Sequence, residues 1–267
     1  MLLLKKSSYT HFFAWDEFHG DNAMEKLQYL GNKMKIYVSG IHRYGTDAVL
    51  LADFSMPKNS DKACDFGTGC GIIPLVWRLN GSSCDITAVD ISADACALAE
   101  HSVRENRIDN FRVINGDLRD AETISGSGIF DVISMNPPYK AASDGVMSPD
   151  EQRRTARHEV ECTLDDICSA AKRLLRFGGR LCMCHRPERL CDIISAMRAA
   201  DIEPKKLRLV CQRRGGVPKL ILIEGRRGAR SGLAHLSPLY IEADDGGVSP
   251  EIAEIYGEYY IKGEDSK

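Results

Sequence analysis

The chain has 267 residues, which is enough to bury one full α/β core with room for extensions. Apolar residues make up 43% and charged residues 27%, ordinary values for a globular protein. No stretch is long and apolar enough to span a bilayer, and the N-terminal charges follow a very short apolar run, the reverse of a secretory signal. These features exclude an integral membrane protein and predict a cytoplasmic one.

Ten cysteines are spread over apolar runs and helical patterns. In such places a free thiol packs as a small hydrophobic side chain. No paired Cys-x-x-Cys spacing of the zinc type is present. We therefore predict free core cysteines and no metal site.

The net charge is −3, but its distribution is uneven. Residues 151–230 hold 19 Lys and Arg against 10 Asp and Glu, whereas the segments before and after are acidic. A basic block inside an acidic protein indicates a local anionic partner. A solvated helical face explains the same block equally well from charge alone.

Apolar runs and helical patterns alternate along the chain. A strand at 35–38 and a helix at 46–52 precede the main series, and a long polar loop covers 140–157. The main strands are predicted at 62–66, 84–90, 111–114, 130–135, 180–184, 207–211 and 220–224, with helices at 72–79, 93–106, 164–175 (closed by Gly178-Gly179) and 187–200. Alternation of this kind predicts an α/β fold with a parallel sheet and helices on both faces. The last two strands have no helix between them, which predicts an antiparallel strand at the end.

This rhythm predicts three regions. Residues 1–55 form an N-terminal extension that includes a lid segment over the ligand-binding edge of the main domain. Residues 56–240 form the main domain, and residues 241–267 a C-terminal tail.

A glycine-rich segment, Asp65-Phe66-Gly67-Thr68-Gly69-Cys70-Gly71, follows the first main strand. Glycines allow a sharp turn and a close approach to a ligand, and ligands of such sheets bind at the carboxyl ends of the strands. The Gly-x-Gly-x-Gly spacing differs from that of pyrophosphate binding. We therefore expect a nucleoside cofactor without phosphates.

Two more acids end the next strands. Asp90, followed by Ile91, ends the second strand and can accept hydrogen bonds from ribose hydroxyls. Asp117 ends the third, where it can accept from an adenine amino group while the Leu118 N–H donates. Each acid could instead cap the helix that follows it.

Asn136-Pro137-Pro138-Tyr139 follows the fourth strand. The lone pair of an amine on an aromatic base is delocalised, so the amine is a poor nucleophile. Acceptance of its hydrogens by the Asn136 side-chain oxygen and the Pro137 carbonyl would orient that lone pair toward a methyl donor. The prolines fix the backbone, and Tyr139 offers a stacking face. The tetrapeptide therefore predicts the catalytic residues of amine methylation.

The order of these two motifs resembles the S-adenosylmethionine-dependent amino-methyltransferases of the class I fold, with a seven-stranded, Rossmann-like sheet. Further segments resemble the bacterial family that methylates N6 of the adenine beside the anticodon of a valine tRNA. They are Thr46-Asp47-Ala48-Val49-Leu50-Leu51-Ala52, Ala156-Arg157-His158-Glu159, Cys162-Thr163-Leu164 and His185-Arg186-Pro187-Glu188-Arg189-Leu190. The resemblance implies S-adenosyl-L-methionine as cofactor, held by Asp65, Gly67, Gly69, Gly71, Asp90, Ile91, Asp117, Leu118 and Asn136. It also implies that Thr46 and Asp47 bind the cofactor, close to its methionine part.

A tRNA substrate requires cations that can reach phosphate. Arg153, Arg154 and Arg157 in the polar loop are candidates, as is Arg186, which could instead form internal ion pairs. The turn at 213–219 departs from the family pattern, and residues 1–24 have no counterpart in it.

Three alternatives stay open at this stage: methylation of a glutamine amide in a release factor, methylation of guanine N2 in ribosomal RNA, and a relict fold that only binds RNA. The basic block favours RNA. For the oligomeric state we favour a monomer.

Overall fold

The computed structural model describes residues 25–31, 34–120, 124, 127–137 and 162–257. No helix in these ranges is long and apolar enough to cross a membrane.

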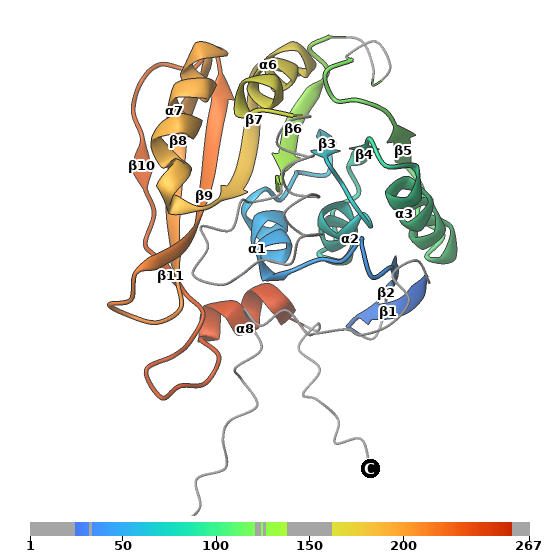
Figure 1. The fold of residues 1–267 in the computed structure, drawn as a ribbon, viewed down its shortest axis with the longest axis horizontal. Helices are drawn as coiled ribbons and strands as arrows, with labels where there is room; N and C mark the ends of the chain where they lie inside the picture. The colour runs from blue at the N-terminus through green and yellow to red at the C-terminus, as the bar shows by residue number, and fades with distance from the viewer. Residues whose placement is uncertain (1–24, 32–33, 121–123, 125–126, 138–161, 258–267) are drawn as a thin grey trace, which may run out of the picture.

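A nine-stranded sheet forms the centre of the described chain (Figure 1). Its order is β10-β8-β9-β7-β6-β3-β4-β5, and β11 also pairs with β8. The strands are β3 (Lys62–Phe66), β4 (Asp85–Asp90), β5 (Phe111–Asn115), β6 (Phe130–Met135), β7 (Leu175–His185), β8 (Ile202–Cys211), β9 (Pro218–Arg227), β10 (Ala234–His235) and β11 (Leu239–Tyr240). Only β9 runs antiparallel to its neighbours, and it lies between β7 and β8. The predicted α/β fold with seven main strands and a final antiparallel strand is confirmed.

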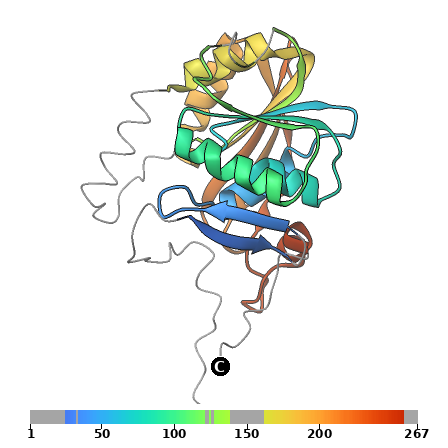
Figure 2. The ribbon, with the colours of Figure 1, turned by 90° about the vertical axis from the view of Figure 1, so that its right-hand side faces the viewer.

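Helices cover both faces of this sheet. One apolar cluster joins the sheet to α1 (Thr46–Phe54), α2 (Ile72–Leu79) and α3 (Ala93–Glu105). The other joins its opposite face to α6 (Leu164–Leu174) and α7 (Leu190–Ala199), the latter preceded by a short 3-10 turn, η1 (Pro187–Arg189). Figure 2 shows the sheet between these two layers. Eight of the ten cysteines are buried, as expected for core side chains. The two others are Cys162, which is partly buried, and Cys191, which is exposed.

Two elements outside the alternating series pack against the α1 layer. The hairpin β1 (Lys26–Leu30) and β2 (Met34–Val38) forms a separate two-stranded sheet beside α3. Near the other end, α8 (Pro250–Tyr256) contacts α1, and Ile252 and Ile255 are buried in the same apolar cluster. The three predicted regions stay a prediction, but residues beyond 240 contribute to the core that holds α1.

The expectation for Gly178 and Gly179 was wrong. These glycines do not close a helix; α6 ends at Leu174, and β7 begins at once and runs through both. The pairing with β6 shifts from Phe130–Leu175 to Val132–Arg180, which is a bulge. A Cβ on Gly179 would lie 2.9 Å from the Phe130 carbonyl oxygen, so glycine is required by this close approach of the two strands.

Candidate active site

Four polar side chains meet at one edge of the sheet because β3, β4, β5 and β6 are parallel and end there. Asp65 lies near the end of β3, Asp90 ends β4, Asp117 follows β5, and Asn136 follows β6. The sequence predicted all four positions. In an open parallel sheet this edge is where ligands bind.

The glycine-rich turn after β3 has the backbone that glycine permits. Gly67, Gly69 and Gly71 have φ angles of 61°, 56° and 83°. A Cβ on Gly71 would lie 3.2 Å from Ala99 Cβ, so Gly71 allows α2 and α3 to pack closely. A Cβ on Gly69 would meet nothing within 4 Å. The turn is therefore open at Gly69, on the side where a ligand can approach.

Asp65 is fully buried below this turn. Its Oδ1 accepts a 2.6 Å hydrogen bond from the Ser134 hydroxyl on β6. Burial raises the pKa of Asp65 to about 7, although the Ser134 and Thr68 hydroxyls lower it in part. Asp65 Oδ2 and Thr68 Oγ1 are both buried, and although the Thr68 hydroxyl is near enough to lower the pKa of Asp65, neither atom has full hydrogen-bonding geometry to any described group. A buried carboxylate oxygen of this kind is suited to a polar or cationic ligand.

Asp90 joins the glycine turn to the end of β4. Its Oδ2 accepts from the Gly69 N–H at 2.8 Å and its Oδ1 from the Ser92 N–H at 2.9 Å. Each carboxylate oxygen keeps a further lone pair for a hydroxyl. Ile91, beside it, is 51% exposed and offers an apolar surface at the same edge.

Asp117 is already paired. Its two carboxylate oxygens accept from Arg119 Nε, each at 2.9 Å, and this pairing lowers the pKa of Asp117. The side chain of Asp117 is 32% exposed, and the neighbouring Leu118 packs partly against the α6 side of the core.

Asn136 lies beside the start of α1. Its side-chain nitrogen, Nδ2, donates a 3.0 Å hydrogen bond to Oδ2 of Asp47. Pro137 is buried, while Pro138 and Tyr139 lie outside the described residues. The structure thus brings together Asn136 and Asp47, 89 residues apart in sequence.

The predicted RNA-binding arginines divide into two groups. Arg153, Arg154 and Arg157, with the segment Ala156 to Glu159, lie outside the described residues. Arg186 is described, and its Nη1 lies 3.5 Å from the carbonyl oxygen of Lys219 at the start of β9.

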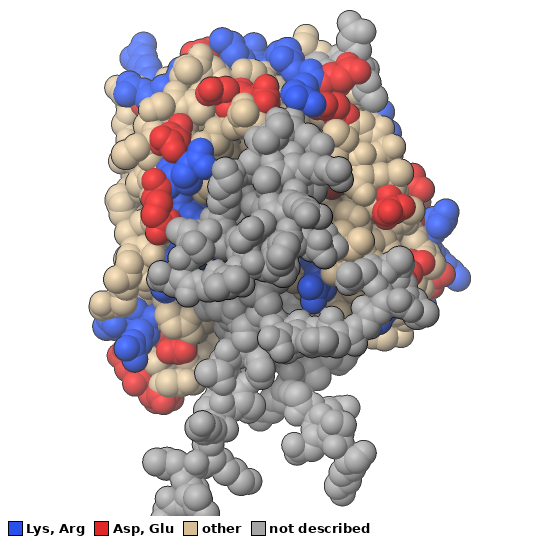
Figure 3. Space-filling view, in the orientation of Figure 1, with Lys and Arg blue, Asp and Glu red and all other residues tan. Residues whose placement is uncertain are grey.

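Much of the basic block is paired with acids in the described chain. Glu224, fully buried on β9, lies within 3.4 Å of Arg180, Lys206 and Arg226. Further pairs link Arg198 to Glu203 and Arg189 to Asp192. Figure 3 shows basic and acidic side chains next to one another on one face. Ion pairs within the protein therefore account for part of the positive charge of residues 151–230.

Comparison with known proteins identifies the family. The methyltransferase small domain family model matches residues 36–197. The chain belongs to this family. It is an S-adenosylmethionine-dependent methyltransferase.

Curated relatives match most of the chain. Proteins named tRNA1(Val) (adenine(37)-N6)-methyltransferase from Parabacteroides distasonis and Porphyromonas gingivalis are 28% and 29% identical to it. Each match covers 82% of this chain, and 91% and 88% of the relative. The crystal structure of a predicted O-methyltransferase from Agrobacterium tumefaciens is 19% identical, with a TM-score of 0.65, covering 80% of this chain and 97% of that one. This likeness shows the fold.

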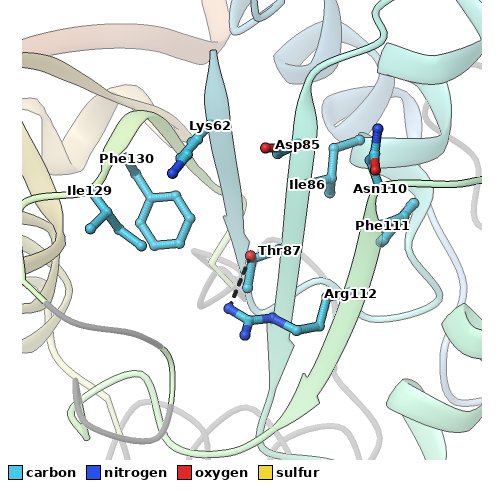
Figure 4. A pocket seen from close by; sticks show the side chains of 9 residues that line it. All are labelled: Lys62, Asp85, Ile86, Thr87, Asn110, Phe111, Arg112, Ile129 and Phe130. Carbon is cyan, nitrogen blue, oxygen red and sulfur yellow. Dashed lines mark hydrogen bonds between the residues drawn. The ribbon is translucent and has the colours of Figure 1, made fainter. Parts of the chain in front are cut away.

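A hollow of about 330 Å³ lies elsewhere on the methyltransferase (Figure 4). Its lining comes mainly from the amino-terminal halves of β3, β4, β5 and β6, away from the edge where the acids meet; the residues are Lys62, Asp85, Ile86, Thr87, Asn110, Phe111, Arg112, Ile129 and Phe130. Arg112 crosses it toward Thr87 at 3.5 Å and donates to the Ile124 carbonyl at 3.0 Å. The hollow is separate from the methyltransferase site.

Three residues that contact the candidate site were not predicted from the sequence. Ser134 stands two positions before Asn136 on β6, and a serine inside an apolar strand was the available sign of a buried polar contact. Asn115 donates to the Asp90 and Ile91 carbonyls at 3.1 and 3.0 Å and joins the ends of β4 and β5. Gly45 precedes α1, and its missing side chain makes room for the Asp47 carboxylate, which no sequence pattern indicates.

Proposed function

We propose that this methyltransferase transfers a methyl group to the exocyclic N6 of an adenine in tRNA, the anticodon-loop adenine of a valine tRNA. The names of the curated relatives support this acceptor. The observation that carries the proposal is the position of Asn136 at the end of β6, on the same sheet edge as the glycine turn and Asp90. An amide at that point can hold an amine next to a bound methyl donor.

The residues of the edge fit S-adenosylmethionine, which when bound supplies a methyl group on a positively charged sulfur. The turn at Gly67 and Gly69 leaves room for the close approach of a ligand. Asp90 has lone pairs for ribose hydroxyls, and Ile91 offers an apolar face for adenine. We assign the remaining cofactor contacts to Gly71, Asp117, Leu118, Thr46 and Asp65.

Asn136 and Pro137 then orient the acceptor. The side-chain oxygen of Asn136 and the carbonyl of Pro137 accept the two amine hydrogens, so the nitrogen lone pair points at the methyl carbon. The N–C bond forms as the S–C bond breaks. The methylated amine gives its extra proton to water. Tyr139 is the proposed stacking face for the base.

The buried Asp65 argues against a relict fold that only binds RNA. A fully buried carboxylate whose pKa is raised to about 7 lowers the stability of the folded protein near neutral pH. A protein without a ligand at this edge has no physical reason to retain it. We also propose a cytoplasmic location, because tRNA takes part in translation there.

Transfer from labelled S-adenosylmethionine tests the acceptor directly. The purified protein is offered unfractionated tRNA, ribosomal RNA and release factor in parallel. We expect label in tRNA, as N6-methyladenosine. Label in guanine N2 of ribosomal RNA or in a glutamine amide of the release factor would show that the proposed acceptor is wrong.

The proposed RNA contacts need a test of their own, because Arg153, Arg154 and Arg157 lie outside the residues that the structure describes. Charge reversal at Arg153 and Arg154 is expected to weaken tRNA binding and to reduce its dependence on salt. Arg157→Glu and Arg186→Glu should act in the same direction. An unchanged salt slope would remove these arginines from the interface.

A further inference from the structure

The side chain of Asn136 has two chemically different ends of nearly equal shape. Its oxygen can accept a hydrogen bond from a substrate amine, whereas its NH₂ group can only donate. The proposed reaction requires the oxygen to face the substrate. Rotation by half a turn would place a donor against the amine hydrogens and would disfavour binding in the reactive orientation.

Asp47 contacts the donor end. Its Oδ2 accepts from Asn136 Nδ2 at 3.0 Å. An ionised carboxylate has only acceptors, so it selects the NH₂ end of the amide and turns the oxygen away from itself. We propose that Asp47 is a positioning residue that fixes which end of the Asn136 amide faces the substrate amine. This inference rests on the proposed role of Asn136 as the acceptor for that amine.

Gly45 makes the contact possible. A Cβ at Gly45 would lie only 2.6 Å from Oδ1 of Asp47, well inside van der Waals contact. The backbone of Gly45 is extended, with φ −118° and ψ 179°, so any residue could adopt it. Glycine is therefore needed at position 45 because it leaves room for the Asp47 carboxylate, and not because of its backbone conformation. The carboxylate rotates away if that space is filled, and its bond to Asn136 is then lost.

Helix α1 holds Asp47 in place. Trp77 Nε1 on α2 donates to the Ala52 carbonyl at 3.0 Å, and Arg180 on β7 donates to the Ser55 carbonyl at 3.1 Å. Both bonds are made at the carboxyl-terminal end of α1, and the five consecutive residues from Ala48 to Ala52 are buried, so the middle of the helix is enclosed on all sides. The carboxylate thus projects from a fixed element, which a positioning role requires.

The test compares Asp47→Ala with Asn136→Ala and with the double variant, all as full-length protein. For Asp47→Ala we expect kcat to fall about 10- to 100-fold, while the dissociation constant of S-adenosylmethionine, measured by calorimetry, changes less than about threefold. Because Asp47 acts through Asn136, Asp47→Ala in the Asn136→Ala background should change kcat less than about twofold. If the kcat losses of the two single variants instead multiply in the double variant, Asp47 does not act through Asn136 and the proposal is wrong. A loss of cofactor affinity as large as the loss of kcat would also overturn the proposal, because it would make Asp47 a cofactor ligand.

Two further variants separate positioning from helix stability. Asp47 is the second residue of α1 and interacts with the positive helix end. Asp165 is the exposed second residue of α6, so Asp165→Asn makes the same kind of charge loss elsewhere and should leave kcat unchanged. Gly45→Ala keeps Asp47 but fills its space, and should lower kcat with an unchanged melting temperature. Full activity of Gly45→Ala would contradict the proposal even if Asp47→Ala fails to fold.

The acceptor of the methyl group and the role of Asp47 can be tested separately. Wild-type protein that methylates an acceptor other than tRNA adenine would overturn the proposed substrate. The same variants compared on that acceptor would still decide whether Asp47 acts through Asn136.

Discussion

The Ser134 hydroxyl donates a 2.6 Å hydrogen bond to the fully buried carboxylate of Asp65. This contact links β6, which is followed by Asn136, to β3, which is followed by the glycine turn. It does not compensate for burial, and the pKa of Asp65 is raised to about 7. Asp65 is therefore the acid of this edge that titrates near neutral pH.

Cofactor affinity should depend on pH through Asp65. The positively charged cofactor favours the ionised carboxylate, so affinity should rise as the pH increases through about 7. Binding at pH 6.5 should release protons, which calorimetry detects in buffers of different ionisation enthalpy. Asp65→Asn should abolish that release. A wild-type protein that binds the cofactor without releasing protons would contradict this role.

The stability of the unliganded protein should show the opposite trend. The Asp65 pKa is raised in the folded state above its value of 3.8, so the unfolded chain loses this proton first as the pH rises. The contribution of Asp65 to stability therefore falls between about pH 4 and 7. Urea unfolding of wild type and Asp65→Asn across this range should show the wild type losing stability relative to the variant. A parallel pH dependence in both would show that Asp65 is not the group responsible.

Gly69 and Gly81 provide a matched pair for the glycine turn. Both have positive φ, 56° and 87°, and a Cβ on either meets nothing within 4 Å. Alanine at each should destabilise the fold by about 1 kcal/mol. Gly81 lies between α2 and β4, at the opposite edge of the sheet. Only Gly69→Ala should weaken cofactor binding, and an equal loss in Gly81→Ala would show that the effect comes from stability.

Asn136→Ala should separate chemistry from cofactor binding. We expect kcat to fall about a hundredfold because the amine loses its orienting acceptor. Cofactor affinity, measured by calorimetry, should stay within about threefold. An equal loss of both would make Asn136 a cofactor residue.

Glu224 should matter for stability and not for the reaction. Three cations surround its buried carboxylate, and they lower its pKa against the opposing effect of burial. Because the three cations are partly exposed, Glu224→Gln should cost about 1–3 kcal/mol at pH 7. A lowered folded pKa means that this contribution is present above the unfolded pKa near 4.5 and is lost as the pH falls. Urea unfolding at pH 7 and pH 4 should show the difference between variant and wild type shrinking at pH 4.

The sequence predicted the sheet edge well because each site residue follows an apolar run. Strand ends in a parallel sheet converge, so Asp65, Asp90 and Asn136 could be placed together from their order alone. The bulge at Gly178 and Gly179 could not be predicted, because it depends on how closely β6 and β7 approach. The Asp47–Asn136 bond was missed for a similar reason: it joins residues 89 positions apart, and no local pattern encodes it.

Methyl transfer from labelled S-adenosylmethionine to an unmodified valine tRNA transcript, followed by digestion and nucleoside analysis, is the decisive measurement for the proposed function. The proposed function predicts a single labelled product, N6-methyladenosine, that maps to the adenine beside the anticodon. The label should fall about a hundredfold with Asn136→Ala. Label in another nucleoside or in protein, or undiminished transfer by Asn136→Ala, would contradict it.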